Sequence, residues 1–249
     1  MNNAQVQVKS PAIANQAAIA DQGIAVPQEK VRVHAPVQIE ESIKTLIQNI
    51  NTELHDRKCR IVQFISSRAG EGTSRIIRKM ARVLASHYHR RVLLLDTDRK
   101  NPTHASAFNV KTRFSWDNTV MEGASSVEAY VTVDHSPLCI GQLMPNHSPS
   151  LQVLSEDQLR DFFDGLRNEF DYILVDSAPL NRSLEALVLS RPVDGVVLIV
   201  EAESTRSEVA DKSVEMIRKH GGDILGVVLN KRKYPIPNYI YRLVKKICG

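Results

Sequence analysis

Short, continuously apolar runs alternate with helical patterns along the middle of the chain, and this alternation constrains the fold most. The runs lack the polar alternation of a half-exposed strand, so both of their faces must be covered. They span residues 61–65, 92–95, 172–175, 195–200 and 224–229, with 140–143 as a further candidate. Such strands separated by helices predict an α/β fold: a doubly wound, mostly parallel sheet with helices on both faces. The ligand site of such a sheet lies at the carboxyl ends of its strands.

Helical spacing of apolar residues predicts the elements between the strands. The predicted helices cover residues 76–88, 157–170, 184–190 and 207–219. A further amphipathic helix starts at Ile39. Its apolar stripe consists of Ile43, Leu46, Ile47, Ile50 and Leu54. We expect this stripe to pack against the core of the protein.

The chain has 249 residues, of which 43% are hydrophobic and 24% charged, enough for one substantial core. Residues 1–36 have no sustained period and are predicted to be a flexible extension. Residues 37–230 form the predicted α/β domain, and residues 231–249 a basic, tyrosine-containing tail. The net charge of +4 is too mild to indicate a nucleic-acid partner.

Cysteine usage and hydropathy indicate the compartment. The cysteines Cys59, Cys139 and Cys248 are far apart, without the spacing of a metal site or a disulfide framework. No run approaches the ~18 apolar residues of a membrane span. The N-terminus lacks the basic-then-apolar order of a signal peptide. These features predict a cytoplasmic protein, one that would reach the inner membrane through a partner.

The loop between the first strand and the helix at 76–88 carries the sharpest local signal. Its residues predicted to bind a cofactor are Gly70, Glu71, Gly72, Thr73, Ser74 and Arg75. Glycines permit the tight turns with which backbone N–H groups at a helix start cradle phosphates. In a standard P-loop the last glycine is followed by lysine and then by a Ser or Thr that binds Mg²⁺. Here Thr73 holds the lysine position, and Ser74 keeps the hydroxyl.

Three aspartates end predicted strands at the edge where this loop would lie. Asp96 and Asp98 follow one strand and Asp176 follows another. Carboxylate oxygens are the ligands that Mg²⁺ prefers beside a polyphosphate. An aspartate after a strand is also a common helix cap, so only the combination points to a nucleotide site.

Together these segments resemble a known family. Residues 70–74, 93–102 and 170–179 match the order of the Walker A, Walker A′ and Walker B motifs in bacterial tyrosine kinases. Those kinases belong to the MinD/ParA group of deviant Walker P-loop proteins. The resemblance implies ATP and Mg²⁺ as cofactors, a role in capsule or exopolysaccharide synthesis and export, and a transmembrane polysaccharide co-polymerase or chain-length determinant as partner.

The resemblance also implies a role for each matched residue. Ser74 and Asp98 would serve the magnesium site, and Asp176 would hold metal-bound water. Asp96 would lie beside the incoming hydroxyl, so Asp96 and Asp98 are the predicted catalytic pair. The tyrosines of the tail, which would be the phosphate acceptors, are Tyr234, Tyr239 and Tyr241.

The chain departs from the family pattern at the lysine and at the oligomer-forming helix. Thr73 removes a point charge from the phosphates, and Arg68 or Arg75 could supply a substitute cation. In the family, the oligomer-forming helix carries a glutamate followed by two arginines at three-residue steps. The corresponding residues of this chain are Glu41, Lys44 and Ile47. Self-association of another kind stays open.

Three functions are consistent with the sequence. The leading interpretation is a tyrosine-kinase-like protein with weakened or lost phosphotransfer. The second is an active protein-tyrosine autokinase that uses a substitute cation, and the third is a MinD/ParA-like positioning ATPase. The basic tail could be a phosphate acceptor, an anchoring segment on the domain, or a contact to an anionic membrane face.

Overall fold

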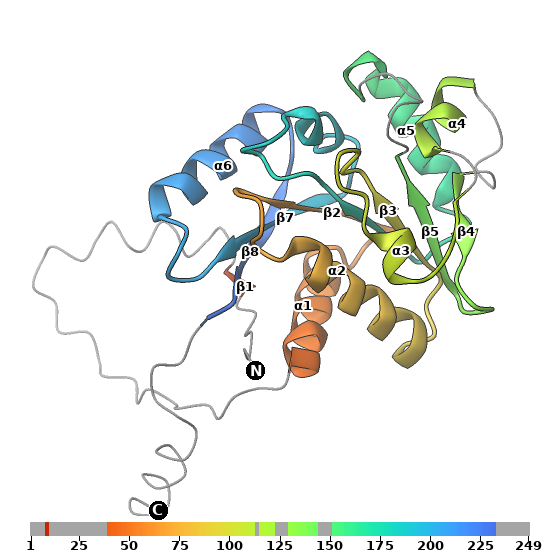
Figure 1. The fold of residues 1–249 in the computed structure, drawn as a ribbon, viewed down its shortest axis with the longest axis horizontal. Coiled ribbons are helices and arrows are strands. Elements are labelled where there is room, and N and C mark those ends of the chain that lie inside the picture. The colour runs from red at the N-terminus through yellow and green to blue at the C-terminus, as the bar shows by residue number, and fades with distance from the viewer. Residues whose placement is uncertain (1–7, 10–38, 113–114, 123–128, 144–150, 233–249) are drawn as a thin grey trace, which may run out of the picture.

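The computed structural model describes residues 8–9, 39–112, 115–122, 129–143 and 151–232. These residues form a sheet with helices on both faces (Figure 1), which confirms the predicted α/β class. The rest of the predicted extension at 1–36 and residues 233–249 of the predicted tail lie outside the described residues. No helix in the described ranges combines the length and the apolar character needed to cross a membrane.

The sheet has eight strands in the order β1-β8-β7-β2-β6-β3-β5-β4. The six strands in the middle of this order run parallel to one another. They are β2 (Arg60–Ser66), β3 (Val92–Asp96), β5 (Leu138–Gln142), β6 (Tyr172–Asp176), β7 (Gly195–Glu201) and β8 (Ile224–Asn230). Two short antiparallel strands form the edges, β1 (Val8–Lys9) and β4 (Val131–Thr132). Of the predicted apolar runs, the one at 140–143 only overlaps its strand, and the others lie wholly within theirs.

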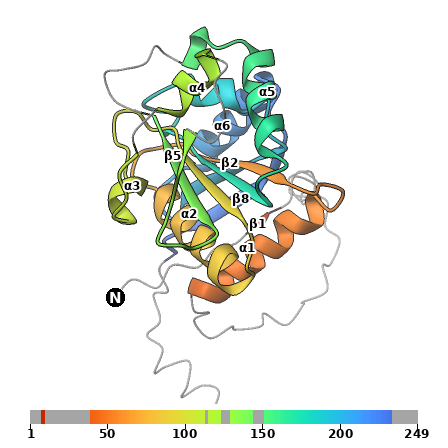
Figure 2. The same ribbon diagram turned by 90° about the vertical axis from the view of Figure 1, so that its right-hand side faces the viewer.

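Helices cover the two faces of the sheet separately (Figure 2). The helices α1 (Ile39–Glu53) and α2 (Thr73–Arg82) pack on the face that carries Val62, Phe64 and Leu94. The helices α4 (Trp116–Glu122) and α5 (Glu156–Leu166) pack on the opposite face. Helix α6 (Ser207–Lys219) lies on that same face, beside β7. The apolar stripe predicted for the first helix is buried throughout. Burial of each such side chain contributes about 1.5–3 kcal/mol to stability.

The helices differ from the prediction at their ends and where they are short; the helix predicted at 157–170, for example, spans Glu156–Leu166. The helix predicted at 76–88 begins at Thr73 and ends in a π-helical turn over Val83–His87. The segment predicted at 184–190 is a 3₁₀ turn, Glu185–Leu189. The one-turn helix α3 (His104–Ala107) and helix α4 were not predicted. Elements this short carry too few periodic positions to stand out in a sequence.

Candidate functional site

The three motif segments meet at one edge of the sheet because their strands are neighbours. Strand β6 lies between β2 and β3, and all three are parallel. In the register of β6, Asp176 pairs with Asp96 on one side and with Phe64 on the other. The loop at 67–72 follows β2 directly. The structure therefore places the glycine-bearing loop and the ends of the two aspartate-bearing strands at a common carboxyl edge.

The loop backbone adopts conformations that favour glycine. Gly70 has a φ of 89° and Gly72 a φ of 94°, both in the left-handed region. The side chain of Asn230, at the end of β8, donates a 2.7 Å hydrogen bond from Nδ2 to the carbonyl of Glu71. A β-carbon on Gly72 would lie 2.3 Å from that Nδ2. Glycine at position 72 thus allows both the turn and the approach of Asn230.

Glu71 turns its carboxylate into the protein. The residue is 2% exposed, and Oε2 accepts a 2.8 Å hydrogen bond from the backbone N–H of Arg68. Oε1 accepts from the backbone N–H of Glu201 and from the hydroxyl of Thr205. These bonds fasten the loop to the end of β7 and the turn after it. The carboxylate therefore shapes the loop, and only the backbone of Glu71 is left to face a cofactor.

The start of α2 has a buried hydroxyl where a P-loop has lysine. Thr73 is the first residue of the helix and is 7% exposed, and its Oγ1 has no hydrogen-bond partner among the described residues. Ser74 is half-buried and Arg75 is exposed. Within the described residues, no hydrogen bond or ion pair joins Ser74 to Asp98 or Asp176. The structure thus puts the predicted metal ligands at one edge without direct contacts between them.

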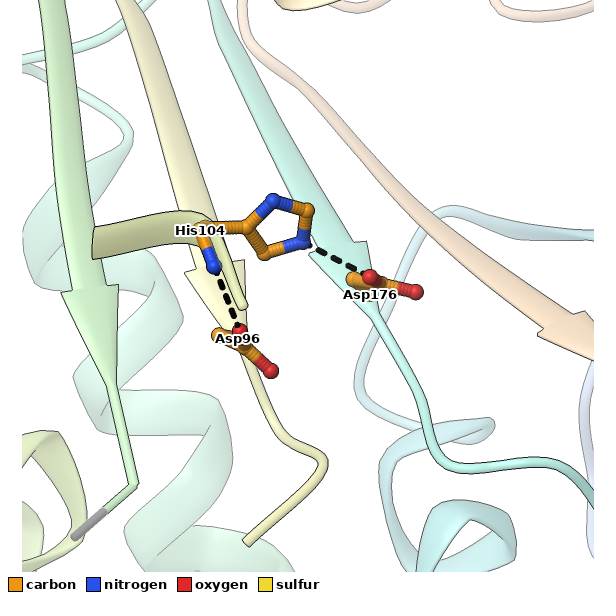
Figure 3. Close-up of side chains that lie close together, drawn as sticks. All are labelled: Asp96, His104 and Asp176. Carbon is orange, nitrogen blue, oxygen red and sulfur yellow. Dashed lines mark hydrogen bonds and ion pairs between the residues drawn. The ribbon is translucent and has the colours of Figure 1, made fainter. Parts of the chain in front are cut away.

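A buried histidine, His104, joins two of the predicted aspartates (Figure 3). Its Nε2 lies 2.7 Å from Oδ2 of Asp176, and its backbone N–H donates to Oδ2 of Asp96 at 3.2 Å. Asp96 also accepts backbone hydrogen bonds from Thr103 at 2.8 Å and from Asp98 at 3.2 Å. Asp96 therefore holds the start of α3, and it lies beside Asp176 at the carboxyl edge of the sheet.

The environment of Asp96 alters its acidity. Burial raises the pKa of Asp96 to about 6. The charge of Asp176 adds to the rise, and His104 together with the backbone N–H of Thr103 opposes it. A carboxylate with such a pKa accepts a proton more readily near neutral pH than an exposed aspartate does.

Sequence reasoning did not single out His104. The ligand atoms of Asp96, His104 and Asp176 lie within 4.8 Å of one another, a cluster that could hold a metal ion. Asp98, which was predicted as a metal ligand, is not part of this cluster. Its Oδ1 accepts backbone hydrogen bonds from Lys100 and Asn101. No local spacing marks His104, because its partner Asp176 lies far along the chain.

The glycine positions allow a first test of the loop. We expect Gly72→Ala to lower the free energy of unfolding by about 2 kcal/mol, because the new β-carbon both meets Asn230 and strains the backbone. Gly70→Ala should cost about 1 kcal/mol, since only the strain applies there. Chemical denaturation measures both.

Gly165→Ala is the control. Gly165 lies in α5, where a β-carbon has nothing within 4 Å, so this change should stabilise the protein by about 0.5–1 kcal/mol. Equal effects of Gly72→Ala and Gly70→Ala would contradict the close approach of Asn230.

Comparison with known proteins identifies relatives. No protein-family model matches the sequence. The tyrosine-protein kinase CpsD of Streptococcus agalactiae is 24% identical over 193 residues, which cover 76% of this chain and 82% of CpsD. The tyrosine-protein kinase YwqD of Bacillus subtilis is 26% identical over 196 residues, covering 78% of this chain and 81% of YwqD. The homologues of this chain are bacterial tyrosine-protein kinases.

A further relative of this chain is named for the biosynthesis and transport of a polysaccharide. The succinoglycan biosynthesis transport protein ExoP of Rhizobium meliloti is 27% identical over 176 residues. That match covers 69% of this chain and 22% of ExoP. This chain thus corresponds to one part of a larger protein in that case.

Solved structures agree on the fold. The kinase domain of the Escherichia coli tyrosine kinase ETK superposes with a TM-score of 0.70 at 16% identity, covering 80% of this chain and 78% of that one. MinD of Pyrococcus horikoshii, solved with Mg-ADP, gives a TM-score of 0.56 at 19% identity, covering 68% and 69%. The sheet and its helices are therefore those of bacterial tyrosine kinase domains and MinD-like P-loop ATPases.

Proposed function

We propose that this chain is a P-loop protein of capsular or exopolysaccharide biosynthesis and export, with weak binding of Mg-ATP and weakened or lost tyrosine phosphotransfer. Its homologues include tyrosine-protein kinases and a succinoglycan biosynthesis protein. The observation that carries the proposal is the meeting of the glycine loop with Asp96 and Asp176, with Thr73 at the lysine position.

The residues present fit a polyphosphate and its metal. The left-handed turns at Gly70 and Gly72 lead into the N-terminus of α2, whose backbone N–H groups suit phosphate oxygens. The unpartnered hydroxyl of Thr73 offers one more donor, weaker than an ammonium group. Ser74, Asp98 and Asp176 supply the hard oxygen ligands of Mg²⁺. Bound Mg²⁺ would neutralise part of the charge on the phosphates.

Asp96 has the properties of a proton acceptor in this proposal. Its carboxylate is buried at the edge of the sheet and its pKa is raised to about 6. Such a group can take the proton of a tyrosine hydroxyl at near-neutral pH. The hydrogen bonds from Thr103, His104 and Asp98 orient it.

The domain organisation follows from the same proposal. Residues 37–230 would be the nucleotide-binding domain, with residues 1–36 as an N-terminal extension whose Val8–Lys9 strand pairs with β8, and residues 231–249 as a basic tail. The partner is a transmembrane polysaccharide co-polymerase, which would hold this chain at the cytoplasmic side of the inner membrane. The chain would work without nucleic acid, and it can self-associate by contacts other than the family's charged helix motif.

Two alternative functions can be tested with the same purified protein. An active protein-tyrosine autokinase would use another cation in place of the lysine. A MinD/ParA-like positioning ATPase is favoured by the structural likeness to MinD. The first predicts tyrosine phosphate on the chain, and the second predicts nucleotide-dependent dimerisation with partner-stimulated hydrolysis.

Purified protein incubated with ATP and Mg²⁺ separates these functions. Calorimetric titration should show weak binding of Mg-ATP, and mass spectrometry should find at most trace phosphate on the tail tyrosines. The reason is that Thr73 stands where a P-loop has the lysine that stabilises the phosphates during transfer. Extensive tyrosine phosphate would overturn the weakened activity in favour of the autokinase. Dimerisation that depends on ATP, with no tyrosine phosphate, would favour the positioning ATPase.

A further inference from the structure

A lysine from the far end of the domain lies against the glycine loop. A β-carbon built on Gly72 would lie 3.9 Å from Cε of Lys231, which follows strand β8. The ammonium group of Lys231 is 3.1 Å from Oε2 of Glu201, at the end of β7. Thr73, at the position of the missing lysine, is the next residue after Gly72. A lysine ammonium group is therefore already present beside the loop.

The backbone holds Lys231 in this place. Asn230 is tied to the loop by its side-chain bond to the carbonyl of Glu71, and its own carbonyl accepts a 2.8 Å hydrogen bond from the N–H of Ala202. Lys231 then takes a left-handed conformation with a φ of 57°, uncommon for a residue with a side chain. The surrounding bonds impose this turn, and the turn brings the lysine stem to Gly72. Strained residues of this kind often accompany functional sites.

The arginines near the loop are less well placed. Arg75 lies in the first turn of α2 and is exposed. Arg68 is exposed, and among the described residues neither it nor any other side chain beyond Gly70's two neighbours comes within 4 Å of a β-carbon built on Gly70. Lys231 is the cation whose described contacts bring it to the glycine beside Thr73.

We propose that Lys231 is the cation that holds the phosphates of bound Mg-ATP at this site, whereas the transition-state role of a lysine at position 73 stays unfilled, so that phosphotransfer remains weak. This inference rests on the proposed nucleotide site. The ion pair with Glu201 is 41% and 30% exposed at its two side chains, so it is weak and exchanges readily. A polyphosphate carries more charge than one carboxylate, and it draws the flexible ammonium from Glu201 to itself. Glu201 is thus the resting partner of Lys231 in the absence of nucleotide.

Calorimetric titration with Mg-ATP tests the role of Lys231 in the full chain. We expect Lys231→Met to weaken binding by on the order of 10- to 100-fold, the usual contribution of a hydrogen bond to a charged group. Lys231→Arg should keep most of the affinity. In the double variant Thr73→Lys/Lys231→Met, the restored loop lysine should bring the affinity back to at least that of the native chain.

Lys219→Met is the matched control. Lys219 also pairs with a glutamate, Glu215 at 2.8 Å, but it lies at the end of α6 that leads toward the amino end of β8. Its substitution should leave Mg-ATP affinity within about threefold, since a distant surface charge is screened. Thermal melting of every variant checks the fold.

The possible outcomes distinguish a failure of the role of Lys231 from a failure of the proposed nucleotide site. Native binding that Lys231→Met leaves unchanged overturns the role of Lys231 and leaves the nucleotide site standing. Binding by Thr73→Lys but not by the native chain does the same. Failure of both the native chain and Thr73→Lys to bind Mg-ATP overturns the proposed function itself. A loss for Lys231→Met that Thr73→Lys repairs supports both.

Discussion

Thr73→Lys should raise the rate of phosphotransfer from Mg-ATP to tyrosine by on the order of 10²- to 10³-fold. Position 73 is the first residue of α2, directly after Gly72, where a P-loop lysine reaches the β and γ phosphates. Charge builds up on these phosphates in the transition state, so a cation placed there stabilises the transition state more than bound ATP. The present hydroxyl at Oγ1 has no partner among the described residues and carries no charge.

The gain in rate should depend on the charge and on the rest of the site. Thr73→Met adds a side chain without the cation and should leave the rate near its native value. Asp96→Asn in the Thr73→Lys background should remove most of the gain, because the hydroxyl proton then has no carboxylate to go to. Initial rates of tyrosine phosphate formation and of ADP release measure the effect. An unchanged rate together with unchanged Mg-ATP affinity would show that the missing lysine is not what limits this chain.

The strands could be predicted because burial on both faces leaves a direct trace in the sequence. The run Val92–Asp96 is apolar up to its last residue, and the sheet covers it on both sides. The loop at 67–72 and the aspartates were also visible, since their positions at the ends of strands follow from that pattern. The common edge of Asp96 and Asp176 is therefore a consequence of strand order that the sequence already implied.

The contacts that complete the site could not be predicted, because each joins distant parts of the chain. His104 meets Asp176 only because α3 folds back over β3, and α3 is a single turn that Asp96 itself helps to hold. Glu71 belongs to the loop predicted to bind a cofactor, yet its carboxylate accepts hydrogen bonds from the backbone N–H groups of Arg68 and Glu201 and from the hydroxyl of Thr205. Lys231 reaches the loop through strand β8. Local spacing carries no signal for such pairs.

Arg167→Ala should lower the free energy of unfolding by about 3 kcal/mol, a drop in melting temperature of roughly 6–12 °C for a chain of this size. Arg167 follows α5 and forms two hydrogen bonds to Asp194, at 2.8 and 2.9 Å. The side chain of Asp194 is only 3% exposed. Loss of the guanidinium leaves that carboxylate buried with the N–H of Ile61 at 2.8 Å and the more distant Arg57 at 3.8 Å.

The same arginine offers a control at its other end. Its Nε pairs with Asp164, whose side chain is 58% exposed, so Asp164→Ala should cost no more than about 1 kcal/mol. Asp194→Asn keeps an acceptor for the N–H of Ile61 without the charge, and in the Arg167→Ala background it should recover part of the lost stability. Asp194 precedes β7, at the edge of the sheet opposite the aspartate cluster, so Mg-ATP affinity should not change. Equal costs for Arg167→Ala and Asp164→Ala would show that the buried carboxylate does not depend on Arg167.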